Sequence, residues 1–336
     1  MRARTKLFVL ILTAIASLHL TACSGGGSGT SSPNPTPAIN NQWTWVGGAN
    51  FTGQSGIYGT EGIAAASNTP GARAEATSWT DPSGNFWLFG GNGNDAAGVS
   101  NLVIGGDYRN DLWKYSGGQW TWMGGSNLIN QPGFYGTQGT PAPANIPGAR
   151  EQAFSWTDSS GDFWLFGGDG CDSQGTYGFL NDLWRFSAGQ WTWMGGSNLV
   201  YQASNFGSQG TPAPTNTPGA RTGGVSWTDA SGNPWLFGGL AYDSTRGLMF
   251  LNDVWKYSAG QWTWIGGSNA IDQQGIYGTE GTPSAANVPG GRLHAVGWAD
   301  ASGKLWLFGG ATPNPNPTVA AAGGQDFQND LWTYQP

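Results

Sequence analysis

The sequence predicts an all-β protein built from four copies of one four-stranded unit. Three observations carry this prediction: a repeated motif, an abundance of glycine, and a scarcity of charge. The motif WLFGG begins at Trp87, Trp164, Trp235 and Trp306, and successive copies lie 71 or 77 residues apart. Glycine contributes 58 of the 336 residues, and charged residues make up only 10%, far below the usual ~25%. Self-similarity at a fixed period is the signature of a repeat architecture.

Two further motifs and the tryptophans follow the same repeat. PGAR or PGGR begins at Pro70, Pro147, Pro218 and Pro289, and NDLW or NDVW begins at Asn110, Asn181, Asn252 and Asn329. All 20 tryptophans fall into five repeat positions with four copies each. We expect them to fill the layers between repeats, because a buried tryptophan hides roughly 150–250 Å². A minority near the loop ends could instead form a sugar platform.

Each unit is predicted to contain four short strands. In the second copy the first strand covers 150–156, and the turn TDSSG that follows has the Asp, Ser and Gly of a tight hairpin. The other three strands are DFWLF at 162–166, NDLWRF at 181–186 and WTWM at 191–194. Aromatic runs of this length, separated by turn residues, suit a four-stranded antiparallel sheet.

This order resembles the kelch repeat, and residues 42–336 are similar to a β-propeller of the kelch and galactose-oxidase type. The landmarks are the double glycine after the second strand, the aromatic residue of the third, and the tryptophan of the fourth. The resemblance implies four kelch-like blades. These units are longer than the ~50 residues usual for kelch, and four blades is the low end of the propeller range.

The last copy has no fourth strand, because the chain ends shortly after Tyr334. The unused copy of that strand is QWTWV at 42–46. We expect the segment 42–46 to complete the last blade and close the ring, since an open edge strand exposes unpaired backbone groups. Closure within one chain predicts a monomer, and the alternative is an eight-bladed ring of two chains.

The first 22 residues are predicted to be a leader rather than part of the fold. A basic start is followed by the apolar run 7–20, which is short for a membrane span. LTAC, ending at Cys23, resembles a bacterial lipobox, and the resemblance implies a lipidated Cys23 and an outer-membrane location. An ordinary secretory signal is the alternative. Residues 23–41 form a Gly-, Ser- and Pro-rich linker, and 42–336 form the propeller.

The charge of the chain excludes some classes of partner. Without the three basic residues of the leader, ten basic residues face 20 acidic ones. Such a surplus of negative charge argues against nucleic acid and against an anionic membrane surface, so the lipid is the expected membrane contact. With Cys23 lipidated, Cys171 is the remaining cysteine, and no intrachain disulfide can form.

One face of the propeller is predicted to carry the long loops. From the double glycine after the fourth strand to the next Pro-Gly there are always 22 steps, as from Gly48 to Pro70. A constant length suggests an ordered loop with an aromatic peg, at Tyr58, Tyr135, Phe206 and Tyr277. Since binding residues concentrate on loops held by a rigid scaffold, these aromatics are the candidate ligand contacts.

The inner strands are predicted to place a second candidate site at the central channel. Arg73, Arg150, Arg221 and Arg292 begin the four inner strands. Four guanidinium groups could hold a carboxylate or phosphate, or each could bond a carbonyl or carboxylate of a neighbouring blade. Glu75, Glu151, Gln152 and His294 differ between repeats beside this ring and are the candidates for chemistry, although a structural role for His294 is the alternative.

The sequence offers little for catalysis. Galactose oxidase relatives use copper held by two histidines and two tyrosines, but His294 is the single histidine left once the leader is removed. That copper site cannot be built, so we expect no cofactor and no metal, and we assign no catalytic residue. The prediction is a binding scaffold for a protein or glycan ligand. The alternative is a mutarotase- or isomerase-like enzyme acting on an anionic sugar in the channel.

Overall fold

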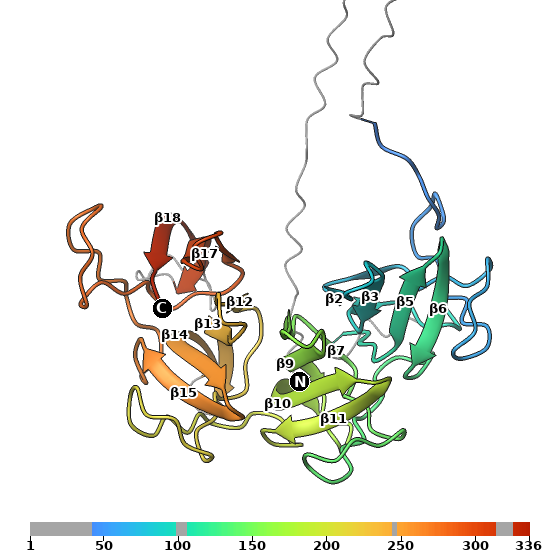
Figure 1. Ribbon diagram of the computed structural model, residues 1–336, viewed down its shortest axis with the longest axis horizontal. Helices are drawn as coiled ribbons and strands as arrows, with labels where there is room; N and C mark the ends of the chain where they lie inside the picture. Colours follow the sequence, from blue (N-terminus) through green and yellow to red (C-terminus); the bar gives the residue numbers. More distant parts are fainter. Residues whose placement is uncertain (1–41, 99–105, 244–246, 314–324) are drawn as a thin grey trace, which may run out of the picture. The chain divides into compact units, whose positions relative to one another are not determined.

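The computed structural model shows an all-β architecture of antiparallel sheets. It describes residues 42–98, 106–243, 247–313 and 325–336. Within these ranges the chain forms strands, turns and loops, and none of it forms a helix able to cross a membrane. The contacts divide the chain into two units, Met1–Gly47 and Gly48–Pro336. The strands of the second unit are shown in Figure 1.

The strands described in the second unit are joined mostly by short turns within a sheet and by long loops between sheets. Their bounds are β1 Arg73–Ala74, β2 Thr77–Thr80, β3 Phe86–Phe89, β4 Asn92–Gly93, β5 Leu112–Ser116, β6 Gln119–Gly124, β7 Arg150–Glu151, β8 Phe154–Thr157, β9 Phe163–Cys171, β10 Tyr177–Ser187, β11 Gln190–Gly195, β12 Val225–Thr228, β13 Pro234–Asp243, β14 Gly247–Ser258, β15 Gln261–Gly266, β16 Val296–Ala299, β17 Leu305–Pro313 and β18 Gln325–Tyr334.

These strands build one sheet per repeat. The first sheet has the order β2-β3-β5-β6 and the third β12-β13-β14-β15. In the second sheet β8, β9, β10 and β11 pair in sequence, and β7 also pairs with β9. The fourth sheet has three strands, β16-β17-β18, and β1 pairs with β4 in a small ladder. The predicted four-strand unit is therefore present in three repeats.

The double glycine after each WLF is required by the backbone. Gly167 and Gly168 have φ values of 62° and 100°, which favour glycine over other residues. A side chain on Gly168 would begin 2.7 Å from the Glu151 carbonyl oxygen of the neighbouring strand. The ladder between β9 and β10 shifts register at this point, between Leu180 and Leu183. Beyond the bulge, β9 continues as far as Cys171 and stays paired with β10 and β7.

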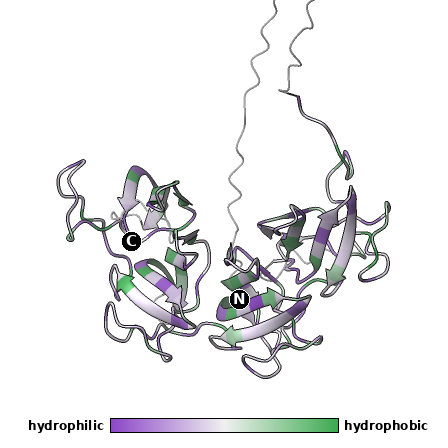
Figure 2. Cartoon of the chain, viewed as in Figure 1, coloured by the Kyte–Doolittle hydropathy of each residue, from purple (hydrophilic) through white to green (hydrophobic). Residues whose placement is uncertain are grey.

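Adjacent sheets pack through aromatic layers. Trp79 of the first sheet stacks on Phe163 of the second, with ring centroids 5.3 Å apart and an interplanar angle of 12°. Between the third and fourth sheets, Trp227 donates its indole N–H to the carbonyl of Trp306 at 3.1 Å. Burial of one tryptophan is worth about 4–6 kcal/mol as an upper bound. Figure 2 shows hydrophobic and hydrophilic residues interspersed along the strands.

The outer side of the fourth sheet is not covered by the described residues. Trp298 and Phe308 are each 44% exposed, whereas their counterparts Trp227 and Phe237 are 8% and 3% exposed. In the first unit, Gln42–Gly47 forms no strand. Trp45 nevertheless donates its indole N–H to the Gly47 carbonyl at 2.7 Å, which is the local bond made by Trp122, Trp193 and Trp264 in the three complete sheets.

Candidate functional site

The four candidate channel arginines form buried ion pairs with the aspartates of the ND(L/V)W motif. Arg150 donates from both terminal nitrogens to Asp182, at 2.6 and 2.7 Å. It also donates to the carbonyls of Gly148 and Gly167 at 2.9 and 3.0 Å. The other pairs are Arg73–Asp111, Arg221–Asp253 and Arg292–Asp330. The four arginine side chains are at most 6% exposed.

The ion pairs keep the carboxylates of Asp111 and Asp330 charged in spite of burial. Burial opposes ionisation of Asp111, but the charge and hydrogen bonds of Arg73 lower its pKa. For Asp330, burial again opposes ionisation, while hydrogen bonds from Arg292, Trp332 and Tyr277 bring the pKa to about 2. A carboxylate that accepts several hydrogen bonds in its charged form is stabilised in that form.

The aromatic pegs of the long loops point back into their own sheets. The hydroxyls of Tyr58, Tyr135 and Tyr277 donate to the motif aspartates at 2.7, 2.7 and 2.8 Å. Tyr58 and Tyr135 are 6% and 5% exposed. Burial, followed by the neighbouring Asp182 charge, raises the pKa of Tyr135 well above its ordinary value. Phe206 has no hydroxyl, and its ring packs against Trp255 and Trp264.

In these positions, the polar groups of the arginines and of the loop tyrosines are already bonded within the fold and are not available to a ligand. Each arginine is held by a carboxylate of its own sheet, and each loop tyrosine locks its loop onto that carboxylate. We therefore do not assign these eight side chains to the ligand site. Tyr277 is the most accessible of the tyrosine pegs, at 50% exposure, and its hydroxyl is still held by Asp330.

The side chains that vary between repeats meet at the inner turns. Glu75, Gln152, Gly223 and His294 occupy one repeat position and share left-handed backbone, with φ of 57°, 52°, 65° and 54°. Gln152 donates its backbone N–H to the Glu75 carbonyl at 3.1 Å, and its side-chain oxygen lies 3.1 Å from His294 Nε2. Left-handed backbone costs about 1–3 kcal/mol for residues other than glycine, and such strain concentrates at functional sites.

Glu151 adds a carboxylic acid to this inner group. Burial, then the charge of Glu75 and a hydrogen bond with Glu75, raise its pKa to about 8, and a hydrogen bond with Asn92 opposes the shift. Glu151 Oε2 is buried and has no hydrogen-bond partner in the described part of the chain. Glu151 therefore holds its proton at neutral pH.

A groove of about 510 Å³ lies between the first and second repeats. Apolar side chains form much of its wall: Leu112, Met123, Pro132, Ile146, Phe186 and Trp191. Polar side chains border them: Glu61, Asn110, Ser126, Gln131, Asn145 and Gln190. Clefts of about 300–1,000 Å³ with apolar walls and a few polar groups are typical ligand sites. The sequence analysis did not identify this groove, because its residues come from separate repeats.

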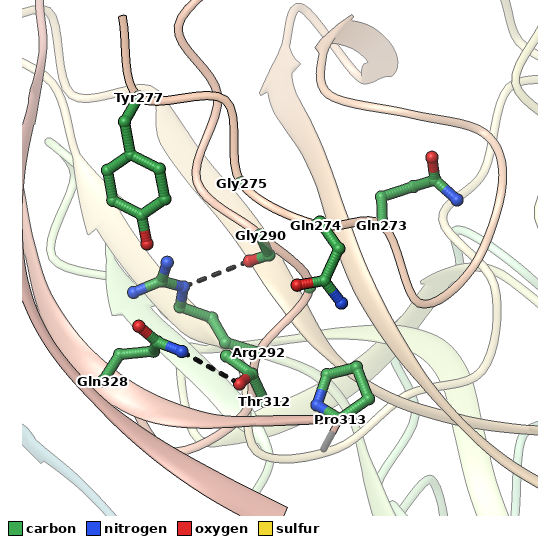
Figure 3. A pocket seen from close by; sticks show the side chains of 10 residues that line it. Gln273, Gln274, Gly275, Tyr277, Gly290, Arg292, Thr312, Pro313 and Gln328 are labelled. Carbon is green, nitrogen blue, oxygen red and sulfur yellow. Dashed lines mark hydrogen bonds between the residues drawn. The ribbon is translucent and has the colours of Figure 1, made fainter. Parts of the chain in front are cut away.

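A much smaller cavity lies in the fourth repeat, beside the Arg292 pair (Figure 3). Its volume is about 70 Å³, which is room for about two water molecules. Arg292 donates Nε–H to the Gly290 carbonyl at 3.1 Å, and Gln328 donates to the Thr312 hydroxyl at 3.1 Å. Both dashed contacts in Figure 3 are internal to the fold. The cavity is too small for a sugar ring.

The described part of the chain contains no cluster of three or more histidine, cysteine or acidic side chains that could hold a metal ion. Asp81 illustrates the role of the turn aspartates: its carboxylate accepts the backbone N–H groups of Ser83 and Asn85 at 3.0 and 2.9 Å. Cys171 is a buried free thiol, and burial raises its pKa to about 12. Neither residue type supplies a reactive group here.

No family model and no curated protein matches the chain. Among solved structures, YjhT is similar at 16% identity and a TM-score of 0.48, covering 80% of this chain and 70% of that one. A fungal alcohol oxidase of the AA5 family, in complex with copper, has 14% identity and a TM-score of 0.35, covering 78% and 54%. A fucose lectin from Kordia zhangzhouensis, in complex with methyl-fucoside, has 17% identity and a TM-score of 0.27, covering 56% and 96%. At these values the similarities say nothing about a ligand.

Replacement of Asp182 by asparagine should destabilise the protein by about 3–5 kcal/mol, because Arg150 would remain charged and buried without its partner. Urea unfolding followed by tryptophan fluorescence measures this loss. Asp162→Asn is the matched control: Asp162 lies 4.0 Å from the partly exposed Arg185, and asparagine occupies the same position in other repeats. The control should cost less than ~1 kcal/mol. Equal effects of the two substitutions would contradict the role assigned to the buried pair.

The raised pKa of Glu151 predicts that the stability of the protein depends on pH. A carboxyl group whose pKa is raised by folding binds more protons in the folded state, so stability falls as pH rises from the unfolded value of about 4.3 to about 8. We expect a fall of about 1–2 kcal/mol, since solvent screens part of the effect. Glu151→Gln should flatten the curve over this range, as measured by thermal unfolding at a series of pH values. A wild-type stability that rises between pH 5 and 8 would refute the assignment.

Proposed function

We propose that this protein is an envelope-anchored binding scaffold whose ligand is a glycan held in the groove between the first two repeats. The observation that carries the proposal is the lining of the groove, in which apolar and aromatic groups lie beside amide and hydroxyl groups. Sugar rings present C–H faces that pack on apolar walls, and their hydroxyls both donate and accept hydrogen bonds. Amide side chains such as Gln131 and Gln190 also do both.

The anchoring part of the proposal is supported by the leader. Cys23 follows a basic and apolar start, and the linker 23–41 has little apolar content with which to fold. A lipidated Cys23 would hold the scaffold at the membrane, and Ser24 after it suggests the outer membrane by analogy with bacterial lipoproteins. These residues lie outside the described ranges.

We also propose that the scaffold is a four-bladed ring completed by residues 42–46. The fourth sheet has three strands where the other repeats have four, and its Trp298 and Phe308 are exposed where their counterparts are buried. In the first sheet Phe86 is 57% exposed, whereas its counterpart Phe163 is 3% exposed. Two apolar sides without a partner, one at each end of the series of repeats, support closure within one chain.

Deletion of residues 42–47 should lower the melting temperature by several degrees, because the last sheet would lose its proposed outer strand and its aromatic cover. Differential scanning calorimetry of the anchor-free protein, with and without these residues, measures the change. Removing an equal number of residues from 30–35 in the linker is the control and should have no effect. Identical melting of all three proteins would refute ring completion by this segment.

Ala144→Trp should weaken glycan binding at least tenfold, because the indole would occupy the groove that Ala144 lines. Ala144 is exposed, so the core should be undisturbed. Ala286→Trp is the matched control, since Ala286 holds the corresponding loop position in the fourth repeat and is also exposed. A glycan array selects the ligand, and calorimetry compares the variants. Unchanged affinity in Ala144→Trp, or no glycan bound by the wild type, would remove the basis of the proposal.

A second candidate function is a sugar isomerase or mutarotase that uses the inner turns. The observation in its favour is the Glu75–Glu151 pair, since a proton donor beside a proton acceptor is what ring opening and closing of a sugar requires. An anionic substrate is disfavoured, because the arginines beside these turns are already paired. For this function Glu151→Gln would abolish turnover, while binding in the groove would be unaffected.

A further inference from the structure

The groove contains a carboxylate at a position where two other repeats have an amide. In the second and third repeats this position is glutamine, and its side chain caps the sheet. Gln138 donates Nε2–H to the Met194 carbonyl at 3.1 Å, and Gln209 donates to the Ile265 carbonyl at 2.9 Å. In the first repeat the same position is Glu61. The carbonyl that corresponds to Met194 O is that of Met123.

Glu61 cannot make the capping bond, because an ionised carboxylate has no proton to donate. None of the hydrogen bonds or ion pairs among the described residues involves the Glu61 side chain, which is exposed. Its Oε1 atom lies 4.0 Å from the point where a side chain on Gly124 would begin, so it remains beside the end of β6. Glu61 and Met123 both line the groove. The Glu61 carboxylate and the Met123 carbonyl can only accept hydrogen bonds, and both belong to residues that line the groove.

The rest of the groove is neutral. Among the residues that line it, Glu61 is the one with a charged side chain. A single carboxylate does not make a metal site, because hard cations such as calcium take six to eight oxygen ligands. A single carboxylate beside a carbonyl suits one ammonium group, which has three protons to donate. The net charge of −7 on the chain also favours a cationic ligand.

We propose that the groove selects a glycan that carries a free, protonated amine, that is, an amino sugar. The ammonium group donates to the Glu61 carboxylate and to the Met123 carbonyl, replacing the amide that caps the corresponding sheets. The sugar ring packs along the apolar wall near Met123 and Pro132. This inference rests on the proposed glycan-binding function and adds the chemical class of the ligand.

The test compares two β-1,4-linked tetrasaccharides, one of glucosamine and one of N-acetylglucosamine. They differ in the amine, which is protonated in the first and acylated in the second. Calorimetry on the mature protein without its lipid should show tighter binding of the glucosamine oligomer, by about two- to fivefold, which is the range of an exposed ion pair. Raising the salt concentration should reduce this preference.

Glu61→Gln is the decisive variant, because it installs the side chain that the second and third repeats already use. It should remove the preference for the amine while leaving the melting temperature at least as high as in the wild type. The substitution changes no residue of the ion pairs or aromatic layers.

The outcomes separate this inference from the proposed function. A preference for the amine that is lost in Glu61→Gln supports it. A preference that persists in Glu61→Gln overturns it, and so does equal binding of both oligomers by the wild type, in which case glycan binding itself stands. If the wild type binds neither these oligomers nor any sugar of a glycan array, the inference and the proposed function both fail.

Discussion

The buried arginine–aspartate pair is the interaction on which the geometry of each repeat depends. In the second repeat, Asp182 receives hydrogen bonds from Arg150, from the Tyr135 hydroxyl and from the Trp184 indole. One carboxylate thus joins the start of the inner strand, the long loop and the third strand. A buried pair contributes little net stability on its own, because desolvation offsets the Coulomb attraction. Its effect is to fix the position of the loop, since no other arrangement would satisfy both charges.

This dependence explains why the most regular residues of the chain are unsuitable as ligand contacts. A side chain that recurs at the same spacing performs the same structural task each time, as the four arginines and the three loop tyrosines show. Residues that differ from one repeat to another do not have such a shared structural task. The inner-turn residues Glu75, Gln152 and His294 differ from one another, and Glu61 differs from Gln138. In a repeat protein, chemistry is better sought where the copies disagree.

The sequence was sufficient for the repeat, for the approximate strand positions and for the hairpin turns. The bulge at the double glycine was not predicted, and β9 continues beyond it to Cys171. The partner of each arginine was not predicted either, because the distance of Asp182 along the chain from Arg150 gives no sign of contact. The loop tyrosines were interpreted as ligand contacts because spacing shows equivalence between loops but not whether a side chain points outward. Whether residues 42–46 complete the last sheet stays a prediction.

The groove could not be derived from the sequence for a related reason. Its walls come from the outer strand of one sheet and from the long loop of the next repeat, such as Met123 and Ile146, and no motif brings such residues together. The one local signal was GTEG in the first and fourth repeats, where the second has GTQG and the third GSQG, and this is small as a sequence difference. Its physical consequence is larger, because it replaces a donor by a charged acceptor at the rim of a cleft.

The basic side chains are mostly paired with acidic ones. Several are buried in ion pairs, and Lys114 and Lys256 lie 3.7 and 3.1 Å from turn aspartates. Positive charge is thus largely matched within the fold, whereas Glu61 has none of these basic residues as a partner.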